Sequence, residues 1–520
     1  MTRNTVSRGR SRWIAAAAMA AAGAMILSAC GGSAPTKGDG SGSDEDLELV
    51  LSVVAAPRSL DPAQLDGGTQ AYVWGAIYDT LLFRDEAGEL QPNAAESWEV
   101  SDDALTITFK IREGMTFSNG EPVDAAAVKN NMDRNAVTPG QEQEKFVNVS
   151  SVETPDDYTV VVSFSAPDPA FLYNMAVDGG VISDPSTVDD ERTPTNPVGS
   201  GPYELNVEET VNGSNYVLER RDDYWNVDAY PYETIEVTVL ADRTAGLNAL
   251  LSGQVDFATV QANELGQVQS SGKFNVVEVE GTSTAYLNLA DRDGTKVEAL
   301  GEVNVRRAIN YAFDREGIVE KLMFGSGVPA VQPFSPKSDG YNADLEGTYT
   351  YDPEKARELL AEAGYADGFT VTMPSTVASQ TFEPTITQSL GDIGITVEWV
   401  PVPSQNTTAA FANGDYGMYW FTMGSNPTPR DVDNFINSST QNPFGWSSPE
   451  LEELLAAADV AIEPEEQAAV YKELSAYIVD QALFAPVFYI NTNNVTTEDV
   501  KFIGDGTNNF TSIRNFVPAG

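Results

Sequence analysis

The sequence contains no histidine and only one cysteine among its 520 residues. Without an imidazole there is no Ser-His-Asp or Cys-His catalysis and no histidine metal ligand. A single cysteine forms neither an internal disulfide nor a CxxC metal site. Basic residues are also few, because 30 Lys and Arg stand against 77 Asp and Glu, a formal net charge of −47. A nucleic-acid partner requires a basic surface that releases counterions, so we expect none.

Apolar and aromatic residues are plentiful by contrast. Hydrophobic residues make up 42% of the chain, which contains 7 Trp, 20 Tyr and 22 Phe. A disordered acidic chain would be poor in aromatic residues, so the sequence predicts packed cores and about two to four domains. The chain has no Walker A motif, no GxSxG and no complete EF-hand loop. We therefore expect no metal site and no cofactor.

Residues 1–29 are predicted to be a signal peptide. Four arginines and no acidic residue precede or enter an apolar run from Trp13 to Leu27, which is shorter than the roughly 20 residues of a membrane-spanning helix. The run ends in LSACG, which resembles a bacterial lipobox whose cysteine, here Cys30, receives the lipid. Residues 30–46 then form a Gly/Ser/acidic flexible tether. This places the protein on the extracytoplasmic face of the bacterial cell membrane; the alternative is an ordinary signal peptide without lipidation.

The rest of the chain mixes strand and helix patterns. Apolar or alternating runs predict strands at residues 47–55, 105–111 and 158–164. Asp124 can cap a helix at 125–134, and apolar residues at i, i+3, i+4, i+7 and i+8 from Val305 predict another. Asp352 with Pro353, Ser448 with Pro449, and Glu463 with Pro464 open three more helices. The fold class is therefore mixed, α/β or α+β, in several lobes.

The order of several segments resembles a known family across nearly the whole chain after the tether. The segments include VRRAINYAFDR at 305–315, YDPEKA at 351–356, GELQPNAAESW at 88–98, FKIREGMTFSNG at 109–120, and the residues at 77–82, 123–128, 199–203, 219–225 and 250–256. Each is weak alone, but their order and spacing are similar to those of the family 5 extracellular solute-binding proteins. These are the oligopeptide, dipeptide and nickel receptors of ABC importers.

The resemblance implies a two-lobed fold of the large periplasmic-binding-protein class, with a ligand cleft between the lobes. Lobe I would contain residues 47–80, 195–283 and 487–520, and lobe II residues 284–486. Residues 81–194 would form an extra subdomain on lobe I. Short crossing strands would join the lobes near 284–289 and 485–490, where the sequence is apolar and β-prone.

The resemblance also implies where the solute binds. In this family the first wall of the cleft follows the Leu60-Asp61-Pro62 segment, which here gives residues 66–72 with the candidates Thr69, Gln70 and Tyr72. The second wall lies in residues 419–426, with the candidates Tyr419, Trp420, Phe421, Thr422, Met423 and Asn426. Aromatic rings beside a Met and small polar residues suit a cleft that stacks on a ligand and hydrogen-bonds its edges. The alternative is that residues 419–426 form a buried strand that runs into a loop.

One position departs from the pattern of the oligopeptide receptors. Those receptors place an Asp shortly after this Trp to hold the ammonium group of the peptide, whereas Thr422, Met423 and Gly424 stand here. Asp431 or Asp433 would supply the charge from a shifted loop, and Arg430 would contact a carboxylate of the solute. The alternative for all three is an exposed surface loop.

The main functional prediction is a monomeric substrate-binding lipoprotein that is not an enzyme. It would capture a small, peptide-like solute by lobe closure and deliver it to an ABC permease and its ATPase. One alternative is a surface sensor or adhesion module on the same fold. Another is a secreted carboxylate-dependent hydrolase, because 77 acidic residues offer many carboxylate pairs.

Overall fold

The computed structural model of the protein describes residues 47–65, 67–85, 88–461, 464–504 and 511–519. All of them belong to one compact unit, Asp46–Gly520. The predicted signal peptide, Cys30 and the tether lie outside the described residues. Within the described residues, no helix is long and apolar enough to cross a membrane.

The largest sheet combines strands from early and late parts of the chain. Its strands are, from one edge to the other, β16 (Tyr419–Gly424), β12 (Phe274–Asn288), β17 (Phe484–Thr497), β11 (Phe257–Val260), β1 (Glu48–Val53), β10 (Thr234–Val239), β9 (Asn215–Arg220) and β8 (Tyr203–Leu205), with β13 (Gly327–Pro329) paired to β17. β1 runs parallel to β10 and β11, and the other pairs are antiparallel. The buried strand predicted at 47–55 is confirmed as β1.

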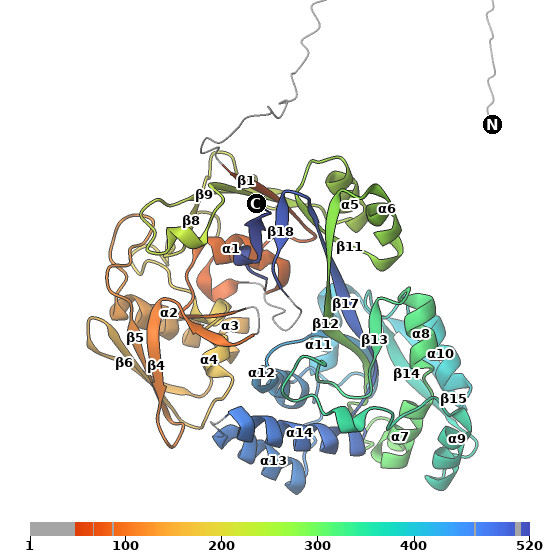
Figure 1. Cartoon of the computed structure of the whole chain (residues 1–520). Coiled ribbons are helices and arrows are strands. Elements are labelled where there is room, and N and C mark those ends of the chain that lie inside the picture. The colour runs from red at the N-terminus through yellow and green to blue at the C-terminus, as the bar shows by residue number, and fades with distance from the viewer. Residues whose placement is uncertain (1–46, 66, 86–87, 462–463, 505–510, 520) are drawn as a thin grey trace, which may run out of the picture. The chain divides into compact units, whose positions relative to one another are not determined.

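Two long strands of this sheet, β12 and β17, run side by side (Figure 1). The C-terminal part of β17 pairs with β11, and its N-terminal part pairs with β13. On its other edge, β12 pairs with β16. The register shifts between Val279 and Ser283, where these two parts meet. Such an irregularity disrupts the ladder locally and bends the strands. Both strands extend beyond the predicted crossing segments, to Phe274 and Thr497.

Residues 81–194 contain an antiparallel sheet of their own. Its strands are β4 (Ala95–Val100), β5 (Thr106–Ile111), β7 (Thr159–Phe164) and β6 (Val149–Asp156), accompanied by β2 (Leu82–Arg84), β3 (Leu90–Pro92), α2 (Ala125–Val137), α3 (Gln141–Glu144) and α4 (Phe171–Asn174). The strands predicted at 105–111 and 158–164 are confirmed as β5 and β7. Asp124 caps α2 as predicted, because its Oδ1 accepts a hydrogen bond from the Ala127 amide at 2.8 Å. A separate hydrophobic core, including the fully buried Phe109 and Val160, stabilises this region.

Helices dominate residues 284–486. One core is shared by α7 (Val303–Tyr311), α8 (Arg315–Leu322), α9 (Pro353–Glu362), α10 (Glu383–Gly391), β14 (Phe369–Ser375) and β15 (Ile395–Pro401). The apolar face predicted from Val305 to Phe313 is confirmed, because each of its residues is at most 1% exposed. Asp352 caps α9 and Ser448 caps α13 (Pro449–Val460), also as predicted. Further elements are α11 (Ser404–Ala412), α12 (Thr428–Val432), the π-turn η8 (Asp433–Asn437) and α14 (Pro464–Asp480).

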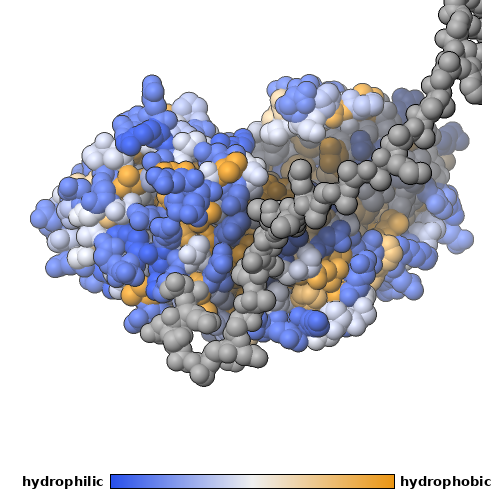
Figure 2. All heavy atoms as spheres, turned by 90° about the horizontal axis from the view of Figure 1, so that it is seen from above, coloured by the Kyte–Doolittle hydropathy of each residue, from blue (hydrophilic) through white to orange (hydrophobic). Residues whose placement is uncertain are grey.

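The remaining elements surround β1 and β11. They are α1 (Ala71–Ile77), α5 (Arg243–Leu251), α6 (Leu265–Ser271), β18 (Val500–Phe502) and β19 (Phe516–Pro518). The face of the molecule seen in Figure 2 is mostly hydrophilic, with hydrophobic residues in smaller patches. This is the surface expected of a chain with so large an excess of acidic residues.

Candidate functional site

A first cavity, called the hinge cavity below, lies where β12 and β17 pass beside β1 and β11. Its volume is about 310 Å³. Neutral polar side chains provide much of its lining, namely Ser52, Thr69, Thr259, Thr282, Ser283, Thr492, Asn494, Thr511 and Asn515. Arg243 is the one charged side chain among the described lining residues. Hydroxyl and amide groups donate and accept hydrogen bonds, so this cavity suits a polar solute without requiring a particular net charge.

Tyr72 lines the hinge cavity while its ring belongs to the core. The ring meets Phe516 and Phe257 edge to face, with centroid distances of 5.4 and 5.9 Å. Burial raises the pKa of Tyr72 above its ordinary value, so its hydroxyl stays protonated. The packed ring fixes the position of this side chain at the cavity wall.

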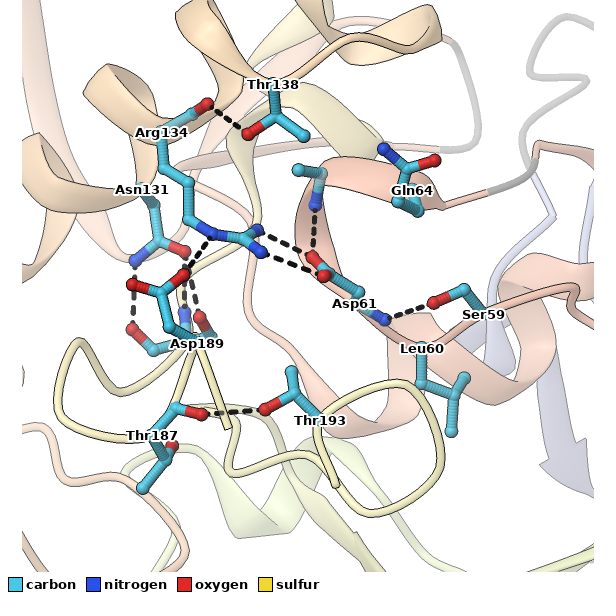
Figure 3. A network of polar contacts seen from close by, with 12 residues as sticks. Ser59, Leu60, Asp61, Gln64, Asn131, Arg134, Thr138, Thr187, Asp189 and Thr193 are labelled. Atoms are coloured by element: carbon cyan, nitrogen blue, oxygen red, sulfur yellow. Dashed lines mark hydrogen bonds and ion pairs between the residues drawn. The ribbon is translucent and has the colours of Figure 1, made fainter. Parts of the chain in front are cut away.

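An ion-pair network fixes the segment that leads to Thr69 (Figure 3). Arg134 of α2 donates from Nη1 to Asp61 Oδ1 at 2.6 Å and from Nη2 to Asp61 Oδ2 at 2.8 Å. Its Nε donates to Asp189 Oδ1 at 3.0 Å. Asp61 Oδ1 also accepts from the Ala63 amide and thereby caps the 3-10 turn η1 (Pro62–Gln64). Because a two-point contact sets both distance and orientation, the network holds this segment against α2.

A second cavity, called the distal cavity below, is lined by residues of 81–194 and of 284–486. Its volume is also about 310 Å³. One wall carries the apolar residues Leu90, Val100, Ile107, Pro169 and Leu172 together with Tyr173. Serine, threonine and amide side chains contribute to the other wall, at Ser335, Ser338, Ser425, Asn426, Thr428 and Gln467. The charged lining residues described are the acidic Glu89, Asp168, Asp339 and Asp459 and the basic Arg84 and Lys337.

Two of these carboxyl groups have altered acidity. Burial and the neighbouring charge of Asp433 raise the pKa of Asp168 to about 6. The same two causes raise the pKa of Asp459 to about 6, although its side chain is exposed to the cavity. Burial and a neighbouring like charge both disfavour ionisation, so the pKa of each group lies just below neutral pH.

Hydrogen bonds at residues 281–283 of β12 link the linings of the two cavities. The Gly281 carbonyl accepts hydrogen bonds from Ser335 Oγ at 3.0 Å and from Ser425 Oγ at 2.7 Å. The Ser425 amide donates to the Thr282 carbonyl at 2.9 Å. Ser335 and Ser425 line the distal cavity, whereas Thr282 lines the hinge cavity. Gly281 has φ +65°, and a Cβ there would lie 2.6 Å from Ser335 Oγ, so glycine is required at this junction.

The structure divides the predicted first wall. Thr69 and Tyr72 line the hinge cavity. Gln70 is half-buried in the turn η2 (Gly68–Gln70) and is not among the described lining residues of either cavity. Solute contact by these three residues stays a prediction, which the cavity supports for Thr69 and Tyr72.

The predicted second wall forms β16, and its two aromatic residues at the start of the strand are buried. Tyr419 stacks on Phe411 with a centroid distance of 4.2 Å and accepts a hydrogen bond from Asn288 at 2.8 Å. Trp420 is 2% exposed and packs against Phe382 and Phe488, at centroid distances of 5.0 and 6.0 Å. Neither residue lines the hinge or the distal cavity. The structure therefore places both rings in the core, as in the alternative of a buried strand.

Phe421, Thr422 and Met423 continue β16 and are half-buried. Side chains alternate between the two faces of a strand, so the residues of β16 are divided between hydrophobic clusters on both sides of the sheet. None of the three is among the described residues that line the cavities.

The loop after β16 brings the last three candidates together. Asn426 lines the distal cavity, and Asp431 holds it in place by accepting hydrogen bonds from its amide at 3.1 Å and from its Nδ2 at 3.0 Å. Asp431 is 1% exposed, and burial raises its pKa to about 7. Arg430 is half-buried, and its charge acts together with the stronger effect of Lys145 to lower the pKa of Asp178, a residue of the 81–194 region. Asp431 therefore positions Asn426 and is not an exposed loop charge.

Sequence reasoning missed much of both linings. The run NTNNVTT at 491–497 of β17 was a usable signal, because it places amides and hydroxyls in a strand that begins with the apolar FAPVFY. Thr492 and Asn494 of this run line the hinge cavity. No such signal relates Asp168 to Asp459, which come from distant parts of the chain. Among the described residues, no group of three or more Cys, Asp or Glu side chains could hold a metal ion.

Residues 89–445 match the family model described as "Bacterial extracellular solute-binding proteins, family 5 Middle". This chain belongs to that family. Heme-binding protein A of Haemophilus influenzae is 27% identical over 520 residues, covering 90% of this chain and 92% of the relative. The glutathione-binding protein GsiB of Escherichia coli K12 is 26% identical over 463 residues, covering 85% and 88%.

Solved structures of the family share the fold. The periplasmic binding protein DppA of Helicobacter pylori, in complex with the peptide STSA, has a TM-score of 0.76 and 25% identity, covering 91% of this chain and 98% of that one. NikA of Brucella suis, in complex with Fe(III)-EDTA, has a TM-score of 0.78 and 24% identity, covering 91% and 100%. The predicted family, the mixed α/β periplasmic-binding-protein fold and the solute-binding role are confirmed. The sensor and hydrolase alternatives do not fit these findings.

Proposed function

We propose that this family 5 protein is the lipid-anchored receptor of an ABC importer for a peptide or peptide-like solute. Lobe I, the extra subdomain and lobe II, with the residue ranges predicted from the sequence, would be the moving bodies, and β12 and β17 their connection. The observation that carries the proposal is the link between the linings of the two cavities at residues 281–283. A solute that reached both linings would contact residues on both sides of the register shift in β12 and β17.

Closure follows from such contacts. A ligand shifts a conformational equilibrium only by the difference between its affinities for the two states. A solute that touches Thr69 and Tyr72 as well as Asn426 gains its full set of contacts only when lobe I and lobe II are close. The closed, loaded form would then be the one that the permease and its ATPase receive from a monomeric receptor.

Two of the similar proteins favour a peptide-like solute. DppA was solved with a four-residue peptide, and GsiB binds glutathione, which is a peptide derivative. The hinge cavity offers the neutral donors and acceptors that peptide amides require. Because peptide backbones are common to all sequences, such a lining favours broad acceptance of short peptides.

Mass spectrometry of co-purified material tests the proposal. The protein is purified, its mass is determined in the native state, and the bound solute is released by denaturation. Short peptides or one peptide derivative are expected, with the same mass before and after long incubation because binding proceeds without turnover. A solute that is converted to products would overturn the receptor function, and a single non-peptide mass would overturn the peptide class alone.

The lipid anchor requires its own test. Cys30→Ser removes the thiol that would accept the lipid. We expect the variant to leave the membrane fraction, because anionic lipid repels the strongly acidic protein. A matched Ser28→Ala variant should remain in the membrane fraction. Retention of Cys30→Ser in membranes would refute the anchor.

A further inference from the structure

Both edges of β17 are interrupted at the same place. On one edge its neighbour changes from β13, which pairs with β17 up to Ile490, to β11, which pairs with it from Asn493 onward (Figure 1). On the other edge the register with β12 shifts between Val279 and Ser283, opposite Asn491. A strand whose ladder is disrupted on both sides bends there more readily than elsewhere. This stretch of β17 is called the pivot below.

Side chains on one face of the pivot supply hydrogen bonds where the backbone ladder is irregular. Thr492 lines the hinge cavity, and the alternation of side chains along a strand places Asn491 and Asn493 on the opposite face. Asn491 bridges the register shift, because its Oδ1 accepts from the Gly281 amide at 3.1 Å and its Nδ2 donates to Glu278 Oε1 at 2.8 Å. Asn491 thus holds the irregular part of β12 against β17.

A loop of lobe II reaches across the pivot on this face. Ser326 immediately precedes β13, and its Oγ donates to Glu278 Oε1 at 3.3 Å and accepts from Asn493 Nδ2 at 3.4 Å. Glu278 lies on the lobe I side of the shift in β12, and Asn493 lies in the part of β17 that pairs with β11. Ser326 therefore joins lobe II to lobe I at two points. Glu278, Ser326, Asn491 and Asn493, called the pivot cluster below, are not among the described lining residues of either cavity.

The geometry of the pivot cluster makes its contacts weak. Both Ser326 contacts are long for hydrogen bonds. Asn493 is 3% exposed, and among the described residues its Oδ1 has no hydrogen-bond partner. The turn before Ser326 contains Phe324, whose φ of +53° is uncommon for a bulky side chain and whose ring is 64% exposed. Contacts that retain an unpaired amide oxygen and backbone strain favour one arrangement of the lobes and still let them reopen.

We propose that the pivot cluster is a lock behind the hinge, in which Glu278 and Ser326 stabilise the closed arrangement of the lobes and raise solute affinity without touching the solute. The extra subdomain and lobe II line one cavity in this structure, so the lobes are close together while the lock is formed. Bending at the pivot would separate Ser326 from Glu278, because they lie on different sides of it. The lock rests on the proposed function and adds two positioning residues for closure.

Calorimetry and small-angle X-ray scattering test the lock with three variants. Glu278→Ala and Ser326→Ala each break the contact across the pivot, whereas Glu278→Gln keeps an acceptor oxygen. The matched control is Glu204→Ala, at an exposed glutamate on β8 of the same sheet. Apparent affinity scales with the closed fraction, so both alanine variants should bind the co-purified solute about two- to tenfold more weakly. Glu278→Gln should lose less affinity, and the control should lose none.

Scattering reports the same equilibrium without solute. The solute-free alanine variants should have a larger radius of gyration than the solute-free wild type, whereas the solute-saturated forms should be equal. A wild type that is mostly open without solute shows the lock mainly as lost affinity, and one that is mostly closed shows it mainly as expansion. Wild-type affinity together with a wild-type radius in both alanine variants overturns the lock alone.

Two further results separate the lock from other roles of these residues. A lock acts equally on every solute, so the co-purified solute and an analogue should lose affinity by the same factor; unequal losses would indicate solute contact and overturn the lock. Melting temperatures show whether the variants fold. Should Ser326→Ala fail to fold, the exposed Glu278 still provides the test through its two variants. A wild type that holds no solute overturns the receptor function and the lock together.

Discussion

The hinge cavity and the distal cavity have nearly the same volume but different construction. The hinge cavity is built largely on one continuous sheet, so the strand ladder fixes the positions of its hydroxyls and amides. The distal cavity is lined by regions with separate hydrophobic cores, and it carries most of the charge. A fixed neutral wall suits features common to many solutes, whereas charge contributed by two regions would make the proposed closure depend on the solute. The comparison therefore predicts that the hinge cavity accepts many solutes and that the distal cavity discriminates between them.

The largest expected effect is that of Trp420→Ala, which tests whether the Trp420 ring belongs to the hydrophobic core or to a cavity wall. Because its ring fills the core between Phe382 and Phe488, Trp420→Ala should lower the free energy of unfolding by about 3–5 kcal/mol. Urea denaturation measures this. The matched control is Trp399→Ala on β15, whose half-buried ring should cost clearly less. Unchanged stability together with a tenfold loss of solute affinity would instead place the Trp420 ring in the binding site.

A smaller effect tests the hinge cavity. Tyr72→Phe removes the one polar atom of a side chain whose ring stays packed against Phe257 and Phe516. Losing one hydrogen bond of about 0.5–1.5 kcal/mol should weaken solute binding roughly two- to tenfold, with little change in stability. Calorimetry with the co-purified solute measures the affinity, and Tyr351→Phe, at a 50% exposed tyrosine, is the control. Equal affinities for Tyr72→Phe and wild type would remove this hydroxyl from the site.

The sequence predicted the scaffold better than the walls of the cavities. The caps at Asp124, Asp352 and Ser448 are local signals, since each side chain bonds an amide two or three residues away. The apolar face of α7 follows from helix periodicity in the same way. Trp420 shows the limit, because a ring beside small polar residues has the same sequence pattern in a core as in a cleft. Its burial depends on Phe382 and Phe488, whose contact with β16 is set by tertiary packing.

The distal cavity lay beyond sequence analysis for a different reason. Asp168 and Asp459 are ordinary acidic residues in a chain with 77 of them. Tertiary packing buries these groups and places them near Asp433, and both effects raise their pKa values. Family resemblance pointed to candidate residues between 419 and 431. Among those candidates, the described lining of the distal cavity includes only Asn426.

The smallest effect, a pH dependence, distinguishes the two cavities in one sample. Asp168 and Asp459 have pKa values raised to about 6, so lowering the pH from 7.5 to 6.0 protonates about half of each group. Affinity for a cationic solute should fall about threefold. The described hinge-cavity lining, whose one charged residue is Arg243, should contribute no change. The Asp168→Asn/Asp459→Asn variant should therefore show a flat profile, and a wild-type profile equally flat would contradict the assignment of charge recognition to the distal cavity.

Lowering the pH should increase the stability contributed by the same two groups while it decreases the affinity for the solute. The opposite signs provide an internal check. Their pKa values are higher in the folded protein than in the unfolded chain, so the folded state binds more protons between about pH 4 and 6. The stability that they contribute is present below this range and is lost as the pH rises through about 6. Acidification should thus raise the free energy of unfolding of the solute-free protein while it weakens solute binding. Parallel decreases in both quantities would indicate general acid unfolding, whereas opposed changes that disappear together in the Asp double variant would locate the effect at these carboxylates.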